Sequence, residues 1–390
     1  MARFLRGIGI LLCVCLGWIW TAPAACAASP LEEGVPVTLT APSAILTEAD
    51  SGAVIFEKNA DDRRPAASIT KLMTILIVLE KLEAGEIGLE DKITVSTAAA
   101  AQPGSQAFLD AGATYPLKDL LKSAVIASAN DSAAALAEHV AGTEGAFVAL
   151  MNGKAEEMGL RNTCYVNCTG LPAQGQYTCA RDVAAISREV AKHPLYFTYS
   201  STWLDTLTHP SGRVTDLTNT NRLVRFYRDC DGFKTGSTEE AKYCLSATAE
   251  KNGMRLIAVV LGVPSSQTRF DEARAMMDWG FSAFSRVEVA KAGDWTGDTV
   301  PVKLGARDSV EAAMEKGISM LLRPGEKEKL TMQTDLVESV TAPVRPGQEL
   351  GTVRILLGGR VVAQVKAVAA REVRMPGLLE GFFRLLENWR

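Results

Sequence analysis

The feature that most constrains this chain is a run of apolar residues that begins directly after a serine and a lysine. From Leu72 to Leu79 all residues but one are apolar, which predicts a helix buried on most sides and ending at Gly85. Packing alone does not call for Ser68 and Lys71 in the first turn of such a helix. Because positions i and i+3 share a helix face, we expect the Ser68 hydroxyl and the Lys71 amine to meet.

Burial gives this serine–lysine pair a chemical meaning. Removal from water disfavours the charged form of lysine, so burial is expected to lower the pKa of Lys71. A neutral amine can accept the proton of a serine hydroxyl, which makes Ser68 a nucleophile. The helix N-terminus favours the negative charge that develops there. Taken alone, however, the pattern S-x-x-K is weak, because short patterns recur by chance.

Two later motifs strengthen the interpretation. Ser128-Ala129-Asn130 lies in an alanine-rich stretch, where a helix cap before a core helix would also explain it. Lys234-Thr235-Gly236 lies in a predicted strand, where Lys234 alone would be an ordinary exposed lysine. The order S-x-x-K, S-x-N, K-T-G is typical of serine acyl-transferases that act on D-Ala-D-Ala peptides or β-lactams. Three ordered matches at such separations are a strong signal.

The first 27 residues predict a secretory signal peptide. Arg3 and Arg6 supply a positive start, residues 8–20 are apolar, and Ala25-Cys26-Ala27 forms a small-residue cleavage site. The alternative is an uncleaved membrane anchor, but the apolar stretch is short for a bilayer span. We therefore expect the chain to be exported.

The composition of the 390 residues is that of a globular protein, with 47% hydrophobic and 22% charged residues. A net charge of −4 is too small to argue for a nucleic-acid partner. Beyond residue 27 the chain holds an odd number of cysteines, which cannot all pair within one chain. We expect small buried residues and leave one disulfide open; the five are Cys164, Cys168, Cys179, Cys230 and Cys244. Their spacing does not indicate a zinc site.

Residues 28–284 predict an α+β domain in which an antiparallel sheet carries a helical subdomain. A hairpin is expected over 43–59, a strand over 232–235, and a second hairpin over 243–262 around the turn at Asn252-Gly253. Residues 87–190 are expected to be mostly helical, with Thr178 as the N-cap of one helix. A last helix over 273–284 should pack on the sheet. Strands at both ends with helices between them favour this fold class.

Residues 285–372 predict a small all-β domain. Short β-like runs at 300–303, 329–333, 337–340, 351–357 and 361–368 are separated by turn clusters. No catalytic constellation is found among them.

Residues 373–390 predict an amphipathic helix. Its apolar residues recur at helical spacing: Leu378, Leu379, Phe382, Phe383, Leu386 and Trp389. A helix this short cannot span a bilayer but can lie in its interface. Docking on the parent domain or on a partner is the alternative, and we favour the membrane surface.

Together these features resemble the low-molecular-mass penicillin-binding proteins, the serine D-alanyl-D-alanine carboxypeptidases of peptidase family S11. Beyond the three motifs, the resemblance includes the stretch after Gly170, the segments 256–262 and 279–281, the β-rich domain and the terminal helix. It implies a β-lactamase/transpeptidase-like catalytic domain. It also implies a peptidoglycan stem peptide ending in D-Ala-D-Ala as substrate, β-lactams as covalent inhibitors, and a place at the outer face of the bacterial cytoplasmic membrane. No metal or organic cofactor is implied.

The resemblance also implies residue roles. Ser68 would be the nucleophile, Lys71 the general base, and Ser128 a proton relay toward the leaving D-alanine. The backbone N–H groups of Ser68 and Ser237 would form an oxyanion hole. Asn130 would hold the acyl side of the substrate peptide. Lys234 would be a cation that attracts the terminal carboxylate and helps Lys71 stay neutral. Thr235 and Arg269 would bind that carboxylate, and Gly236 completes the K-T-G motif.

Three alternatives remain at this stage. A class A-like β-lactamase needs a deacylating glutamate in an E-x-x-x-N loop, and none of the glutamates between Asn130 and Lys234 has an asparagine four residues on. A D,D-endopeptidase or a weak transpeptidase would use the same motifs. A non-catalytic cell-wall-binding scaffold predicts a lost nucleophile or base, yet Ser68 and Lys71 are both present.

Overall fold

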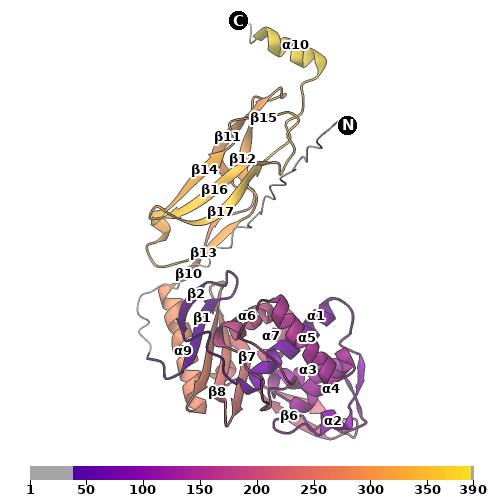
Figure 1. Ribbon diagram of the computed structural model, residues 1–390. Coiled ribbons are helices and arrows are strands. Elements are labelled where there is room, and N and C mark those ends of the chain that lie inside the picture. The colour runs from indigo at the N-terminus through magenta and orange to yellow at the C-terminus, as the bar shows by residue number, and fades with distance from the viewer. Residues whose placement is uncertain (1–37, 388–390) are drawn as a thin grey trace, which may run out of the picture.

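The computed structural model describes residues 38–387, and the side chains of the last helix are described only as far as residue 382. The predicted signal peptide and Trp389 lie outside the described residues. The chain forms two bodies along its length, the first up to residue 284 and the second beyond it (Figure 1).

A five-stranded antiparallel sheet organises the first body. Its order is β2-β1-β9-β8-β7, so the N-terminal hairpin pairs with strands that come about two hundred residues later. β7, which carries the K-T-G motif, lies at an edge of the sheet. The strands are β1 (Ser43–Glu48), β2 (Val54–Lys58), β7 (Cys230–Thr238), β8 (Lys242–Lys251) and β9 (Met254–Val263).

Both faces of this sheet are covered by helices, which explains why β9 reads as an almost continuous apolar run. Ile257, Val259 and Leu261 belong to the core shared with the helical subdomain. Leu256, Ala258 and Val260 belong to a second core under α9 (Ser266–Ala283). Figure 1 shows α9 on one side of the sheet and α6 and its neighbours on the other.

The helical subdomain is built around α1 (Lys71–Glu83), whose residues from Lys71 to Leu79 are all buried. Two short antiparallel pairs accompany it, β3 (Lys92–Thr94) with β4 (Thr114–Pro116) and β5 (Leu204–Thr208) with β6 (Val214–Thr218). Its other helices are α2 (Thr97–Ala100), α3 (Leu117–Ile126), α4 (Asn130–Ala141), α5 (Glu144–Glu157), α6 (Ala180–Ala191), α7 (Pro194–Ser200) and α8 (Leu223–Phe226).

The predicted α+β fold class is confirmed, including both hairpins and the turn at Asn252-Gly253. Three details were wrong. Residues 87–190 are not mostly helical, because they also contain β3, β4 and a long loop between α5 and α6. The last helix begins at Ser266, because Ser265 caps it by accepting the Thr268 amide at 3.1 Å. The N-cap of α6 is Cys179, whereas the hydroxyl of Thr178 is hydrogen-bonded to the hydroxyl of Thr163 at 2.8 Å.

The second body is the expected all-β unit. Its six-stranded sheet has the order β14-β16-β17-β12-β11-β15, and β10 pairs with β13 separately. Three strands were not predicted: β10 (Ser285–Ala290), β12 (Ser309–Met314) and β13 (Ile318–Leu322). The expected run at 337–340 is mostly loop, since β15 covers only Val340–Thr341. The remaining strands are β11 (Trp295–Lys303), β14 (Leu330–Leu336), β16 (Glu349–Leu357) and β17 (Arg360–Ala369), and α10 (Leu378–Glu387) follows them.

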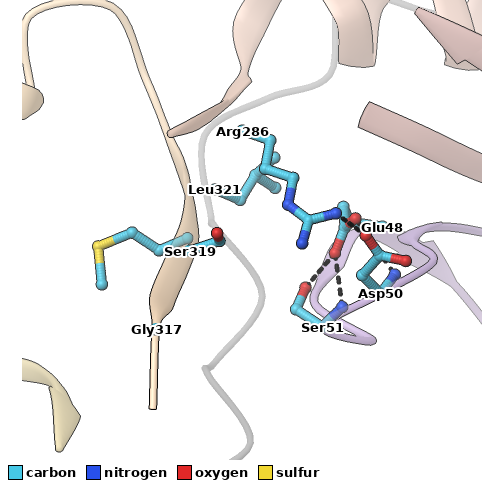
Figure 2. Close-up of a pocket in the computed structure, with 8 residues that line it drawn as sticks. Glu48, Asp50, Ser51, Arg286, Gly317, Ser319 and Leu321 are labelled. Carbon is cyan, nitrogen blue, oxygen red and sulfur yellow. Dashed lines mark hydrogen bonds and ion pairs between the residues drawn. The ribbon is translucent and has the colours of Figure 1, made fainter. Parts of the chain in front are cut away.

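A cavity of about 240 Å³ lies where the β1–β2 turn of the first body meets β10 and β13 (Figure 2). Arg286 forms an ion pair with Asp50 across this junction. Glu48 shapes the turn by accepting the amides of Asp50 at 3.2 Å and Ser51 at 2.7 Å. The two bodies are therefore joined by polar contacts as well as by the chain itself.

Candidate active site

Ser68 and Lys71 meet at the start of the central helix. Ser68 lies on a 3₁₀ turn, Ala67–Thr70, that runs directly into α1. Residues i and i+3 eclipse each other on a 3₁₀ turn, and the Lys71 Nζ atom lies 3.0 Å from the Ser68 Oγ atom. The pair thus has the geometry of a nucleophile beside its base, although the serine precedes the α-helix rather than lying in its first turn.

The Lys71 amine is removed from water. The side chain is fully buried, and burial lowers the pKa of Lys71 from 10.5 to about 7, against the opposing charge of Asp131. A second hydrogen bond runs from Nζ to the Thr169 carbonyl oxygen at 2.6 Å. Near neutral pH the amine is therefore available as a proton acceptor.

Two glycines let the backbone of the neighbouring segments approach Ser68 closely. A Cβ atom at Gly170 would lie 2.0 Å from the Ala67 carbonyl oxygen, and Gly170 has a φ of +83°. A Cβ atom at Gly236 would lie 2.4 Å from the Ala66 carbonyl oxygen and 3.1 Å from the Ser68 amide nitrogen. The loop after α5 and strand β7 thus enclose the nucleophile from two sides.

The S-x-N motif lies at the start of α4. Ser128 is buried with a φ of 62°, a left-handed conformation that is uncommon for a non-glycine residue. Asn130 donates its side-chain N–H to the Pro103 carbonyl at 2.5 Å, while its buried Oδ1 has no hydrogen-bond partner among the described residues. The next residue, Asp131, accepts the amides of Ala107 and Leu109 at 3.0 Å each. The motif therefore also holds the loop around residues 103–109.

The K-T-G motif brings a second buried amine to the site. Lys234 is fully buried and donates to the Thr235 carbonyl at 3.1 Å. Burial lowers the pKa of Lys234 well below its usual value, and the charges of Lys71 and Arg269 add to this effect. The Thr235 hydroxyl donates to the Thr220 hydroxyl at 2.8 Å.

Arg269 reaches the same strand from α9. Its Nη1 atom lies 3.2 Å from the Gly236 carbonyl oxygen. Burial lowers the pKa of Arg269 to about 10, so the guanidinium keeps its charge at neutral pH while Lys71 and Lys234 are pushed toward their neutral forms. Ser237, at the exposed end of the motif, presents its backbone next to this group.

Comparison with known proteins shows the family of the chain. Residues 28–265 match the family model described as D-alanyl-D-alanine carboxypeptidase, and residues 284–375 match that of the penicillin-binding protein 5 C-terminal domain. The chain belongs to the D-alanyl-D-alanine carboxypeptidase family. The family predicted from the three motifs is therefore confirmed.

Relatives of the family match over most of their length. D-alanyl-D-alanine carboxypeptidase DacF of Bacillus subtilis is 38% identical over 90% of each chain, and DacC of Escherichia coli is 35% identical over 90% of this chain and 89% of the relative. The crystal structure of penicillin binding protein 5 from Haemophilus influenzae has a TM-score of 0.77 and 30% identity, covering 88% of this chain and 100% of that one.

Ser68, Lys71 and Gly236 lie together, and Lys234 lies close enough to feel the charges of Lys71 and Arg269, whereas no contact among the described residues joins Ser128 or Asn130 to Ser68. Some of the groups that hold these residues carry no signal in the sequence. Thr169 and Pro103 act through backbone carbonyls, so their side-chain types carry no signal. Thr220 is a threonine in a loop, and nothing in its surroundings marks it.

The five cysteines of the described chain are all free thiols. Among residues 38–387, no group of three histidine, cysteine, aspartate or glutamate side chains is arranged to hold a metal ion.

Proposed function

We propose that this protein is a serine-type D-Ala-D-Ala carboxypeptidase that removes the terminal D-alanine from peptidoglycan stem pentapeptides through an acyl-enzyme on Ser68, and that β-lactams acylate the same serine. The observation that carries the proposal is the fully buried Lys71 amine, 3.0 Å from the Ser68 hydroxyl, with a pKa of about 7. Membership of the carboxypeptidase family supports the same substrate class.

Acylation begins with proton transfer from the Ser68 hydroxyl to the Lys71 amine. The oxygen of Ser68 attacks the carbonyl carbon between the two D-alanines, and the carbonyl oxygen becomes an oxyanion that accepts from the backbone N–H groups of Ser68 and Ser237. The proton then passes through Ser128 to the leaving amine, the peptide bond breaks, and free D-alanine departs. Asn130, whose Oδ1 is unpartnered in the described chain, accepts from the acyl part of the peptide.

The terminal carboxylate of the substrate binds beside K-T-G. Arg269 is the resident cation there, because its pKa of about 10 leaves it charged. Thr235 turns its single hydroxyl hydrogen from Thr220 to the carboxylate. The family resemblance implies a cationic Lys234, yet burial and two neighbouring cations disfavour its charge in the free protein. The arriving carboxylate offsets that penalty, so Lys234 takes up its proton together with the substrate.

A water molecule completes the cycle. Lys71, once its proton has gone to the leaving group, accepts a proton from water, and the resulting hydroxide cleaves the Ser68 ester. A class A-like β-lactamase would need a dedicated glutamate for this step. Glu144 contacts the residue before Thr169, but its Oε1 already accepts from the Cys168 amide at 3.1 Å and from the Cys168 thiol at 3.2 Å. The structure thus favours the carboxypeptidase over the lactamase.

The decisive experiment measures D-alanine release from a peptide ending in D-Ala-D-Ala by residues 28–374, with and without penicillin. We expect release that stops as penicillin acylates the protein. No release, together with rapid penicillin turnover, would contradict the proposal and identify a β-lactamase. Cleavage of a cross-linked dimer with no release of terminal D-alanine would identify an endopeptidase.

We further propose that the protein is exported by a signal peptide over residues 1–27 and held at the outer face of the cytoplasmic membrane by residues 373–390. The chain between these two segments would consist of a catalytic domain, residues 28–284, and a β-rich domain, residues 285–372. On α10, Leu378 is 97% and Leu379 77% exposed, which supports an apolar face available to lipid. Among the described helices, none is long and apolar enough to cross a bilayer.

A further inference from the structure

The carbonyl oxygen of Thr169 contacts the proposed general base directly, and a loop holds it there. It accepts from Lys71 Nζ at 2.6 Å. A neutral amine has two N–H bonds and one lone pair, and a carbonyl oxygen can only accept. When one N–H is directed at Thr169, the lone pair is free to turn toward the Ser68 hydroxyl. The position of this carbonyl therefore controls how the base faces its nucleophile.

The loop that carries Thr169 is folded by one side-chain amide. The Oδ1 atom of Asn167 accepts from the Thr169 amide at 3.2 Å, the Thr169 hydroxyl at 3.2 Å and the Gly170 amide at 2.7 Å. Its Nδ2 atom donates to the Leu171 carbonyl at 2.9 Å. Asn167 thus ties together the three residues that follow Cys168, and only an amide of this length supplies both the acceptor and the donor.

A second amide fixes Asn167 itself. Gln176 accepts from the Asn167 backbone amide at 3.0 Å and donates to the Leu171 carbonyl at 3.1 Å. The base of the loop is closed by paired backbone hydrogen bonds between Cys164 and Tyr177, at 2.9 and 3.1 Å. The Asn167–Leu171 turn is therefore held by side chains rather than by a strand or a helix: Asn167 acts from within, and Thr74 and Glu144 anchor the backbone of Cys168 from outside.

We propose that Asn167 is a positioning residue for acylation: by folding the Asn167–Leu171 turn it holds the Thr169 carbonyl against Lys71, so that the amine faces Ser68 and stays shielded from water. This inference rests on the proposed function of Ser68 and Lys71. Asn167 touches neither the substrate nor the reacting atoms in this account. Its contribution is transmitted through Thr169 and through Gly170, which packs on the backbone before Ser68.

The test is the pH dependence of acylation by a fluorescent penicillin in the full chain carrying Asn167→Ala. Loosening the turn turns the amine away from Ser68 and admits water to it. We expect the plateau rate at alkaline pH to fall by about tenfold to a hundredfold, the range in which small misplacements of reacting groups act. We also expect the acid limb to move to higher pH, because water stabilises the charged amine. A variant with the wild-type plateau and acid limb would overturn the inference.

The matched control is Asn152→Ala. Asn152 is also half-buried and also binds this loop through its amide, with bonds to the backbone of Tyr165 at 2.9 Å each and to the Val148 carbonyl at 3.1 Å. It does not touch the Asn167–Leu171 turn. We expect Asn152→Ala to lower thermal stability while its acid limb stays at the wild-type pH. An equal shift in both variants would mean a general loss of structure and would contradict a specific role.

Asn167→Asp supplies the rescue. Aspartate keeps the oxygen that accepts from Thr169 and Gly170. It lacks the N–H that donates to the Leu171 carbonyl, but this carbonyl still accepts from Gln176. Its plateau rate, measured where Lys71 is neutral, should return most of the way to that of the wild type; a rate as low as that of Asn167→Ala would contradict the proposal. Failure of the proposed function is distinguishable, because the wild-type protein itself would then either not be acylated or release no D-alanine from the peptide.

Discussion

The two bodies of this protein treat polar side chains in opposite ways. The first buries many of them, including Lys71, Lys234, Asp131 and Arg269, whereas the second, among its described side chains, buries only Thr296. Thr296 is satisfied by donating to the Ala312 carbonyl at 3.1 Å. Burying an amine disfavours folding, so a domain that only had to be stable would not place two of them together. The first body therefore accepts a lower folding stability in order to bury the amines of its active site, whereas the second body has an ordinary β-sheet core.

The largest expected effect comes from the nucleophile. Ser68→Ala should lower acylation by penicillin by on the order of 10⁴-fold or more, because no other group can form the ester. Gel fluorescence after incubation with labelled penicillin measures this. Ser200→Ala, a buried serine that donates to the Asp231 carbonyl, is the control and should label normally. Undiminished labelling of Ser68→Ala would contradict the assignment of Ser68 as the nucleophile.

The second prediction concerns the stability that the buried base costs. The folded-state pKa of Lys71, about 7, lies below its ordinary 10.5, so between these values the unfolded chain holds the extra proton. The penalty is therefore largest below pH 7 and fades as the pH rises toward 10.5. We expect the stability advantage of Lys71→Met over wild type to shrink by about 2 kcal/mol between pH 7 and pH 9.

Urea unfolding at the two pH values measures this difference. The control lies in the second body, where Lys366 is exposed and pairs with Glu349 at 2.6 Å. Its pKa is raised by that hydrogen bond, so it keeps its proton over this range in both states. The stability difference between Lys366→Met and the wild type should therefore not change with pH. If the stability difference between Lys71→Met and the wild type is equally independent of pH, the Lys71 amine is not buried as described.

The smallest effect on chemistry is expected at the far end of the second body. Removing residues 375–390 should leave the rate of acylation unchanged, since Leu378 and Leu379 are exposed and no described contact links α10 to the site. The same deletion should release the protein from phospholipid vesicles in a sedimentation assay. Continued sedimentation of the truncated protein would show that another surface binds lipid.

Much of the fold of both bodies could be predicted from the sequence, because buried helices and strands produce recognisable patterns of apolar residues. The apolar run after Lys71 and the turn at Asn252-Gly253 each have a local physical cause, and three motifs marked the site. What escaped prediction depends on tertiary context. β12 contains alanine and glutamate, which favour strands weakly, and only its pairing with β11 and β17 makes it a strand.

The parts of the site that could not be predicted are backbone groups. Thr169 offers a carbonyl to Lys71, and any residue type has one. The N-cap of α6 was misplaced by one residue because a cysteine, not the preferred threonine, faces the Asp182 amide. The suppressed charge of Lys234 depends on Lys71 and Arg269, which are distant in the sequence.

The central claim is that Lys71, buried and with its pKa lowered to about 7, activates Ser68. The pH dependence of the penicillin acylation rate of the wild-type protein tests it most directly. A base must be deprotonated to act, so the rate should rise with pH through an acid limb near 7, the pKa that burial gives to Lys71, and then level off. A limb near 10, the range of an exposed lysine, would contradict the account.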